Sequence, residues 1–350
     1  MALSDYEKKE WDLLQKRKAA TVRRRAREFL PDSLRDRASD AADLIRRAPG
    51  ADFVADAYET AAEGLGNFIG SAASSTVRSE SVVEQFRDAG YSVDGLQGIR
   101  SLDLEEVDSV VSWSRVRFGH AGMAALTGAG TAGVITGAEV LIARGSTADE
   151  GARNAPKMGA VAAAVGVDTV ALLGLASRTV ASTAQYYGYD PRRPEEQVFM
   201  MSVLSLGMAA GTPAKTAAYA ELSQLTQLLF RNAGWDKLSE KVLTRLVQEF
   251  AAKFGFRLTK KKLGQVVPVA GILIGGGLNY SLVDRIAVAA NVAYRERFLI
   301  ERSDGELLDE EDDVIDAPAR SDEGAISVIG LLEDADALPS PDPSHDSTTE

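Results

Sequence analysis

Two carboxylates lie inside apolar stretches of the sequence, where a buried acid or base could serve catalysis. Asp168 is flanked by Val167 and Val170, and Glu139 follows another apolar run. A buried carboxylate is costly unless it is ion-paired or hydrogen-bonded, so Asp168 requires a partner, and Arg178 is the local candidate. Two carboxylates with different pKa values could act as general acid and base. An internal salt bridge that fixes helix register is the competing interpretation.

Most other catalytic and ligand-binding chemistries lack their residues. The chain has no cysteine and only two histidines, which excludes a thiol nucleophile, an iron–sulfur cluster and a Cys/His zinc site. A Gly-x-Gly-x-x-Gly pattern at 128–133 follows an alanine-rich run rather than a strand, so it does not predict a dinucleotide site. Basic triplets are few, at 16–18, 23–25 and 260–262 of an acidic chain. We therefore predict no metal, no cofactor and no nucleic-acid partner.

The negative charge of the chain is concentrated at one end. The 350 residues are 45% hydrophobic, which suffices for a large core, and they carry a net charge of −12. Residues 301–350 hold seventeen acidic and two basic side chains, whereas residues 1–300 hold 34 acidic and 37 basic ones. Such an acidic, weakly apolar segment repels itself and cannot repay the entropy of folding, so we predict a disordered tail. The first twenty residues carry no apolar leader, which favours a cytoplasmic location.

The remaining 300 residues have the pattern of helices. A short helix is expected over 82–89, ended by Gly90, and another begins at 102–107 with acids in its first turn, where the helix dipole favours them. No segment alternates β-branched and polar residues as a strand would. The predicted fold is therefore all-α, a single multi-helix domain with glycine- and alanine-rich apolar core helices. We divide the chain into amphipathic basic N-terminal helices at 1–50, a helical domain at 51–300 and the tail.

The N-terminal helix carries an apolar stripe at helical spacing, formed by Trp11, Leu14, Val22 and Phe29. Its basic residues lie mostly on other faces. An amphipathic basic helix of this kind is typical of a segment that contacts a membrane or a partner protein. The alternative is that the stripe packs on the body of the protein.

Three long segments have no charged residue, namely 121–138, 197–214 and 263–283. Each is long enough to span a membrane, but glycine, alanine and polar residues dilute the leucine, isoleucine and valine that drive insertion. Glycines four residues apart, as at Gly133 and Gly137, let helix backbones approach closely in lipid or in a core. We favour tightly packed core helices, and insertion of a glycine-rich hairpin into the membrane is the alternative.

Three patches of the sequence together resemble the EcsC proteins. The first is Leu-Gln-Gly-Ile-Arg-Ser-Leu-Asp-Leu-Glu-Glu-Val at 96–107. The second runs from 166 to 190 and ends in Tyr-Tyr-Gly-Tyr-Asp, close to a Tyr-Gly-Phe-Asp phrase of the family. The third combines Val-Pro-Val-Ala-Gly at 267–271 and Gly-Gly-Gly-Leu-Asn-Tyr at 275–280 with the later Ala-Tyr-Arg at 293–295. The order and spacing of all three patches agree with the family.

The resemblance implies an all-helical body and a connection to membranes. EcsC proteins are cytoplasmic or membrane-peripheral, and the founding members are encoded beside subunits of an ABC transporter; a hydrolase activity has been suggested for the family. The resemblance carries over no catalytic residue. The candidate binding residues within and near the patches are Asp168, Arg178, Tyr187, Asp190 and Asn279.

We therefore expect a non-enzymatic, membrane-peripheral helical protein that acts on or beside a membrane or a transporter complex. The basic N-terminal helix, the glycine-rich apolar segments and the family resemblance favour this function. One alternative is a hydrolase-type enzyme with Asp168 and Glu139 as acid and base in a helical bundle. Another is a soluble scaffold or cargo protein that docks through its C-terminal peptide.

An apolar island interrupts the acidic tail. It consists of Ile326, Val328, Ile329, Leu331 and Leu332, bounded on both sides by acidic pairs. A segment selected only for solubility does not need these side chains, and such islands often order when they bind a groove. We expect a protein partner to hold the island; folding back onto the protein's own body is the alternative.

Overall fold

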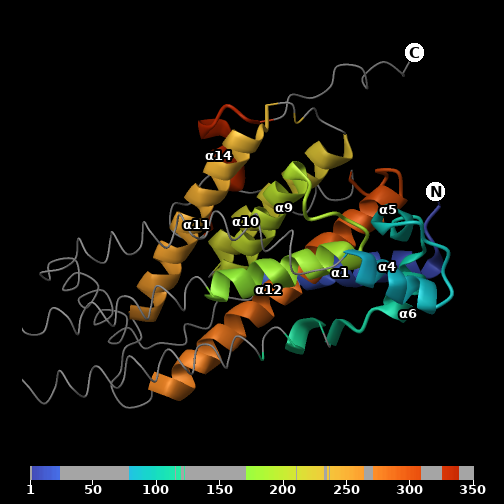
Figure 1. Ribbon diagram of the computed structural model, residues 1–350, viewed down its shortest axis with the longest axis horizontal. Coiled ribbons are helices and arrows are strands. Elements are labelled where there is room, and N and C mark those ends of the chain that lie inside the picture. Colours follow the sequence, from blue (N-terminus) through green and yellow to red (C-terminus); the bar gives the residue numbers. More distant parts are fainter. Residues whose placement is uncertain are drawn as a thin grey trace, which may run out of the picture.

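A computed structural model describes residues 2–23, 79–114, 116–119, 122, 171–209, 211–231, 235, 237–263, 271–308 and 325–338. In these ranges every regular element is a helix, which confirms the all-α prediction (Figure 1). The helices are α1 (Asp5–Arg23), α4 (Ser79–Asp88), α5 (Leu96–Ile99), α6 (Leu104–Val110), α9 (Pro194–Met208), α10 (Thr212–Phe230), α11 (Glu240–Leu263), α12 (Gly271–Arg302) and α14 (Val328–Asp334). Residues 171–186 are helical as well.

Helices α9 and α12 form the centre of the described body. Residues 293–300 of α12 are all buried, so neighbours surround the helix on every side there. α9 is apolar around its circumference, as a fully enclosed helix must be. The two helices pack closely at Gly207, where an added Cβ would lie 2.5 Å from Cγ1 and 2.8 Å from Cα of Ile286.

The apolar segment 197–214 is divided between two helices. Its first part lies in the buried α9, the chain turns at 209–211, and α10 begins at Thr212. Segment 121–138 lies outside the described residues. None of the described helices has the length and apolarity needed to cross a membrane.

The N-terminal helix packs on the body. Its buried positions are Glu7, Trp11, Leu14 and Lys18, which follow one another at helical spacing, and α1 contacts α6, α10 and α12. Trp11 is 5% exposed and Leu14 is 3% exposed. The prediction that these two side chains contact a membrane or partner is therefore wrong for this conformation, because the apolar stripe is used to cover α10 and α12. The side chain of Val22 and the whole of Phe29 lie outside the described residues.

The apolar island of the tail folds back onto the protein. Most of the island lies in α14, which packs on α9, α10 and α11. The five large apolar side chains of the island are at most 7% exposed. Residues 301–308 are ordered too and contribute the buried Leu307 and Leu308. The predicted disorder therefore does not extend to 301–308 and 325–338, because the apolar side chains of these residues pack in the hydrophobic core. The expected partner of the island is, in this structure, the body itself.

Glu221 of α10 caps the start of α14. Its Oε1 accepts hydrogen bonds from the backbone N–H of Val328 at 2.8 Å and from the hydroxyl of Ser202 at 3.4 Å. Burial nevertheless raises the pKa of this carboxyl above its ordinary 4.5, and the bonds from Ser327 and Val328 only partly oppose the rise. The docked state therefore takes up a proton more readily than the undocked state.

Docking of α14 is expected to strengthen as the pH falls. A raised folded-state pKa means that the contribution of Glu221 is complete below about pH 4.5 and is lost as the pH rises through the folded value. Amide hydrogen exchange of residues 326–334 at pH 5 and pH 7 measures this, with slower exchange expected at pH 5 after correction for the intrinsic rate. Glu221→Gln keeps an acceptor without the charge and should remove the difference. An equal pH effect in that variant would contradict the assignment.

Candidate functional site

Three consecutive charged residues lie in the buried part of α12. Arg295, Glu296 and Arg297 are 8%, 4% and 6% exposed. Successive helix positions point about 100° apart, so these side chains leave α12 in three directions and need partners from different elements. Together with their partners Glu10, Lys18, Asp108, Glu196 and Glu301 they form what we call the ion-pair cluster.

Arg295 joins α12 to α6 and α1. Its Nη1 donates to Oδ1 of Asp108 at 3.0 Å, its Nη2 donates to the other oxygen of the same carboxylate, and Nη2 lies 3.1 Å from Glu10. Nη1 also approaches the hydroxyl of Tyr187 at 3.3 Å. A bidentate contact between guanidinium and carboxylate is the strongest geometry for such a pair, and it fixes α6 against α12.

Arg297 joins α12 to α9. Its Nη1 donates to Oε2 of Glu196 at 2.8 Å, and its Nε donates to Glu301 at 3.0 Å, one turn along the same helix. The hydroxyl of Tyr294 donates to the other oxygen of Glu196 at 2.7 Å. Glu196 is 3% exposed, and its carboxylate contacts one cation and one hydroxyl inside the protein.

Glu296 joins α12 to α1. Its Oε1 accepts a hydrogen bond from the ammonium of Lys18, which is 2% exposed, and another from the amide of Gln15 at 3.4 Å. The ammonium also lies 5.5 Å from the ring centroid of Tyr219 on α10. Departure of α1 from the body would therefore break a buried ion pair.

A second contact fixes the start of α1. Glu7, which is fully buried, accepts hydrogen bonds from the backbone N–H of Ser4 at 3.0 Å and of Leu104 at 3.3 Å. Nε of Arg302 donates to the same carboxylate at 3.0 Å. One side chain therefore helps to cap α1, helps to cap α6 and pairs with the end of α12.

The Tyr-Tyr-Gly-Tyr-Asp phrase wraps around the ion-pair cluster. Tyr187 stacks on Trp113 with ring centroids 4.9 Å apart. The ring of Tyr189 lies between two guanidinium groups, 4.1 Å from Arg297 and 5.1 Å from Arg100. Gly188, with φ +85°, permits this turn, because an added Cβ would lie 2.6 Å from the carbonyl oxygen of residue 96.

Burial keeps the tyrosine hydroxyls of this region neutral. Desolvation and the hydrogen bond to Asp108 raise the pKa of Tyr6 to about 12, and desolvation is the main cause that raises the pKa of Tyr187, Tyr189 and Tyr294. These phenols act as hydrogen-bond partners rather than as acids at neutral pH. The ion-pair cluster therefore has the geometry of a structural contact that fixes helices against one another.

The candidate residues from the sequence separate in space. Tyr187 joins the ion-pair cluster through Arg295, whereas Asp190 stays in its own loop, where it accepts bonds from the backbone N–H and guanidinium of Arg192. Asn279 is buried in α12, sixteen residues or about 24 Å before Arg295. Arg178 is exposed on the helix at 171–186. Asp168 and Glu139 lie outside the described residues, so their pairing and catalytic roles stay predictions.

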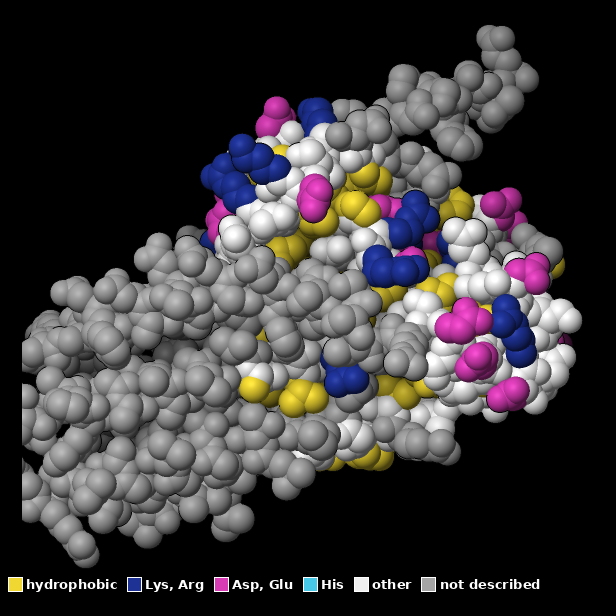
Figure 2. Space-filling model, in the orientation of Figure 1, with side chains coloured by type: hydrophobic (Ala, Val, Ile, Leu, Met, Phe, Trp, Pro, Cys, Tyr) yellow, Lys and Arg dark blue, Asp and Glu magenta, His cyan; other side chains and the backbone are white. Residues whose placement is uncertain are grey.

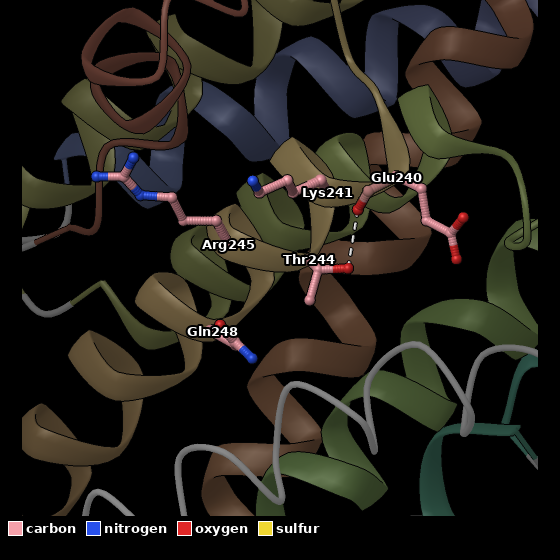
Figure 3. Close-up of a pocket in the computed structure, with 5 residues that line it drawn as sticks. All are labelled: Glu240, Lys241, Thr244, Arg245 and Gln248. Atoms are coloured by element: carbon pink, nitrogen blue, oxygen red, sulfur yellow. Dashed lines mark hydrogen bonds between the residues drawn. The ribbon is translucent and has the colours of Figure 1, made fainter.

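A shallow depression of about 480 Å³ lies on the described surface (Figure 3). Its lining comes from a single helix, α11, and consists of Glu240, Lys241, Thr244, Arg245 and Gln248. The labelled side chains spread over the outside of the helix, and the hydroxyl of Thr244 bonds to the backbone of Glu240 at 2.8 Å (Figure 3). Such a helix face does not enclose a substrate. In the described ranges no group of His, Asp and Glu side chains is arranged to hold a metal ion.

Sequence reasoning missed most members of the ion-pair cluster. No role is assigned to Glu196 from the sequence, and of the Arg-Glu-Arg run at 295–297 only Arg295 is used, as the end of the third family patch. The available signal was the run itself, which interrupts a helix that is otherwise apolar on both sides, with Tyr294 before it and 298–300 after it.

Parts of the three sequence patches meet in the structure. Residues from 96–107, 187–189 and 294–297 come from distant parts of the chain and meet at the ion-pair cluster. Residues 166–170 and 267–270 lie outside the described residues, and Asn279 lies about 24 Å away along α12. The fold and the ion-pair cluster define a class of helical protein in which buried ion pairs hold the helices against one another. The family model of the EcsC protein family matches residues 3–299, and the chain belongs to this family.

A curated relative covers part of the chain. The protein is similar to the uncharacterised protein YdbA of Bacillus subtilis (strain 168), with 32% identity over 137 residues. The match includes 39% of this chain and 47% of the relative, so the chain spans about half the length of that relative. No solved structure matches the chain.

Proposed function

We propose that this protein is a non-enzymatic, membrane-peripheral helical protein that acts at a membrane surface or beside a membrane complex. The observation that carries the proposal is the distribution of charge at the C-terminal end of α11 and the N-terminal end of α12. α11 ends with the basic run Lys260–Lys262, and α12 begins with thirteen uncharged residues, 271–283. Both ends point to the same side of the body, at the lower left of Figure 1.

The opposite end of the molecule is held by the ion-pair cluster. The C-terminal part of α12, α5 and α6 lie together there, on the right of Figure 1, and on the face in Figure 2 acidic and basic side chains gather over this end. The charge-free part of α12 is about 20 Å long at the usual rise per residue, which is shorter than the hydrocarbon core of a bilayer. Its last residues, Leu282 and Val283, are buried in the body, so the proposed lipid contact belongs to the residues before them.

A basic run beside an apolar segment is a two-part membrane signal. Each lysine near an anionic surface contributes about 1 kcal/mol, and burial of apolar side chains at the interface adds to it. Neither part alone gives stable binding, and together they give reversible attachment. The ion-pair cluster supports this proposal because it keeps the far end of α12 fixed in the body while the near end meets lipid.

Binding to anionic vesicles is the expected result. The purified full chain is floated with vesicles of phosphatidylglycerol and phosphatidylcholine at low salt, and with pure phosphatidylcholine vesicles. Lys260→Ala combined with Lys261→Ala should weaken binding to the anionic vesicles by about thirtyfold, since two charges are lost. The matched control is Lys241→Ala with Arg245→Ala, which removes two exposed charges from the other end of the same helix. Equal weakening by both pairs, or no binding of the parent to either vesicle, would contradict the proposal.

A further inference from the structure

Two polar side chains of the body bind the backbone of the C-terminal segment 325–338. The hydroxyl of Ser205 accepts from the N–H of Ile326 at 2.8 Å and donates to the carbonyl of the same residue at 2.7 Å. Glu221 accepts from the N–H of Val328 at 2.8 Å. We call the surface of α9, α10 and α11 that carries these two side chains and lies under α14 the docking face.

The apolar side chains of the segment supply the remaining contact. Val328 and Leu332 are fully buried and Leu331 is 2% exposed, whereas Ser327 caps the helix by accepting from the N–H of Gly330 at 2.9 Å. The segment therefore brings its own N-cap and a compact apolar face, which is how a short peptide helix binds a protein surface.

The segment takes no part in the ion-pair cluster. An ion pair that it makes with the body, Lys237 to Asp336 at 3.5 Å, joins two exposed groups. Sixteen residues, 309–324, separate it in sequence from the end of the α12 region, and they hold eight acidic side chains and one basic one. The docked state also buries the carboxyl of Glu221, which accepts hydrogen bonds from Val328 and Ser202.

We propose that the docking face is a helix-binding surface and that segment 325–338 occupies it as a displaceable, tethered ligand. The partner that displaces it carries a short apolar helix of the same chemistry. Such a helix starts with a Ser or Thr N-cap, presents branched aliphatic side chains on one face, and offers free backbone N–H groups to Ser205 and Glu221. Ser205 and Glu221 bind backbone groups, which every peptide has. The positions of the aliphatic side chains on the bound helix therefore determine which peptides bind.

A labelled synthetic peptide of residues 325–338 tests the proposal by fluorescence anisotropy. The two proteins compared are the parent full chain and a full chain with Val328→Asp and Leu332→Asp, in which the tethered segment cannot dock. The tethered segment competes with the peptide in the parent, so the variant should bind the peptide at least tenfold more tightly. A peptide with the same two substitutions is the control and should bind neither protein. Equal binding of the peptide to both proteins, or no binding to a folded variant, overturns the proposal.

A second measurement does not depend on the folding of that variant. A protease site is placed in the parent chain between residues 316 and 321, and the chain is cut after purification. Native mass spectrometry is then expected to show loss of the C-terminal fragment on dilution and its replacement by the labelled peptide. A fragment that stays bound against a hundredfold excess of peptide, or a body that unfolds when it leaves, overturns the proposal, because the segment is then a fixed part of the fold.

Discussion

Replacing Glu196 by alanine is expected to lower the free energy of unfolding by about 3–5 kcal/mol, because removal of one partner of a buried ion pair leaves Glu301 as the one acidic partner of Arg297 among the described residues. Arg297 is 6% exposed and would lose its contact with α9, and the hydroxyl of Tyr294 would lose its acceptor. The midpoint of thermal unfolding should fall by roughly 6–10 °C or more. Circular dichroism at 222 nm during heating and urea titration measure both quantities.

A double variant distinguishes an uncompensated charge from a general packing defect. Glu196→Leu combined with Arg297→Met replaces the pair by apolar side chains of similar volume, and such replacements of buried pairs are often neutral or stabilising. The double variant should therefore be clearly more stable than Glu196→Ala. Glu196→Gln retains an acceptor for Tyr294 and should fall between them. A Glu196→Ala protein as stable as the parent would show that this contact contributes nothing to the fold.

The fold could be predicted from local sequence signals because those signals act within each helix. The helix start at 102–107 is confirmed by the capping box of α6, in which Asp103 accepts from the backbone of Glu105 at 2.9 Å and Glu106 accepts from Asp103 at 2.8 Å. The helix over 82–89 corresponds to α4, which is followed by Gly90 at φ +95°. Caps, acids in the first turn and a glycine stop are properties of neighbouring residues, so they are visible without the tertiary structure.

The ion-pair cluster could not be predicted in the same way. A charged residue on a helix is usually solvated, and Lys18, Glu196 and Arg297 become buried only because partners from distant parts of the chain meet them. The partner of Lys18 lies 278 residues away. The sequence showed which residues resemble the family, but not that Tyr187 and Arg295 touch each other.

The apolar island illustrates the same limit from the other side. Its side chains predicted a bound state, and this is what the structure has, but nothing in the local sequence identified α9, α10 and α11 as the receiving surface. The two polar side chains that select the position, Ser205 and Glu221, are unremarkable members of helical patterns. Docking depends on both the island and the surface that receives it, and only the island has a recognisable sequence pattern.

Deletion of residues 1–20 is expected to unfold the protein. Truncation of a buried tryptophan such as Trp11 costs about 3–5 kcal/mol, and of a buried leucine such as Leu14 about 2–5 kcal/mol. Loss of Lys18 breaks the buried ion pair with Glu296, at about 3–5 kcal/mol more. The sum is comparable to the total stability of an ordinary domain, about 5–15 kcal/mol. The truncated chain should be recovered as insoluble protein or show no cooperative thermal transition.

The matched control retains α1 and changes only its exposed face. Lys8→Ala with Lys9→Ala removes two exposed charges from the same helix and should leave the unfolding transition within about 1 °C of the parent, because surface substitutions usually change stability by less than 0.5 kcal/mol. Trp11→Ala alone should remain folded and melt at a lower temperature. If the truncated chain folds as well as the parent and loses only vesicle binding, the packing of α1 on α10 and α12 is not what holds the body together, and the N-terminal helix is instead the membrane-contacting element that its amphipathic sequence indicates.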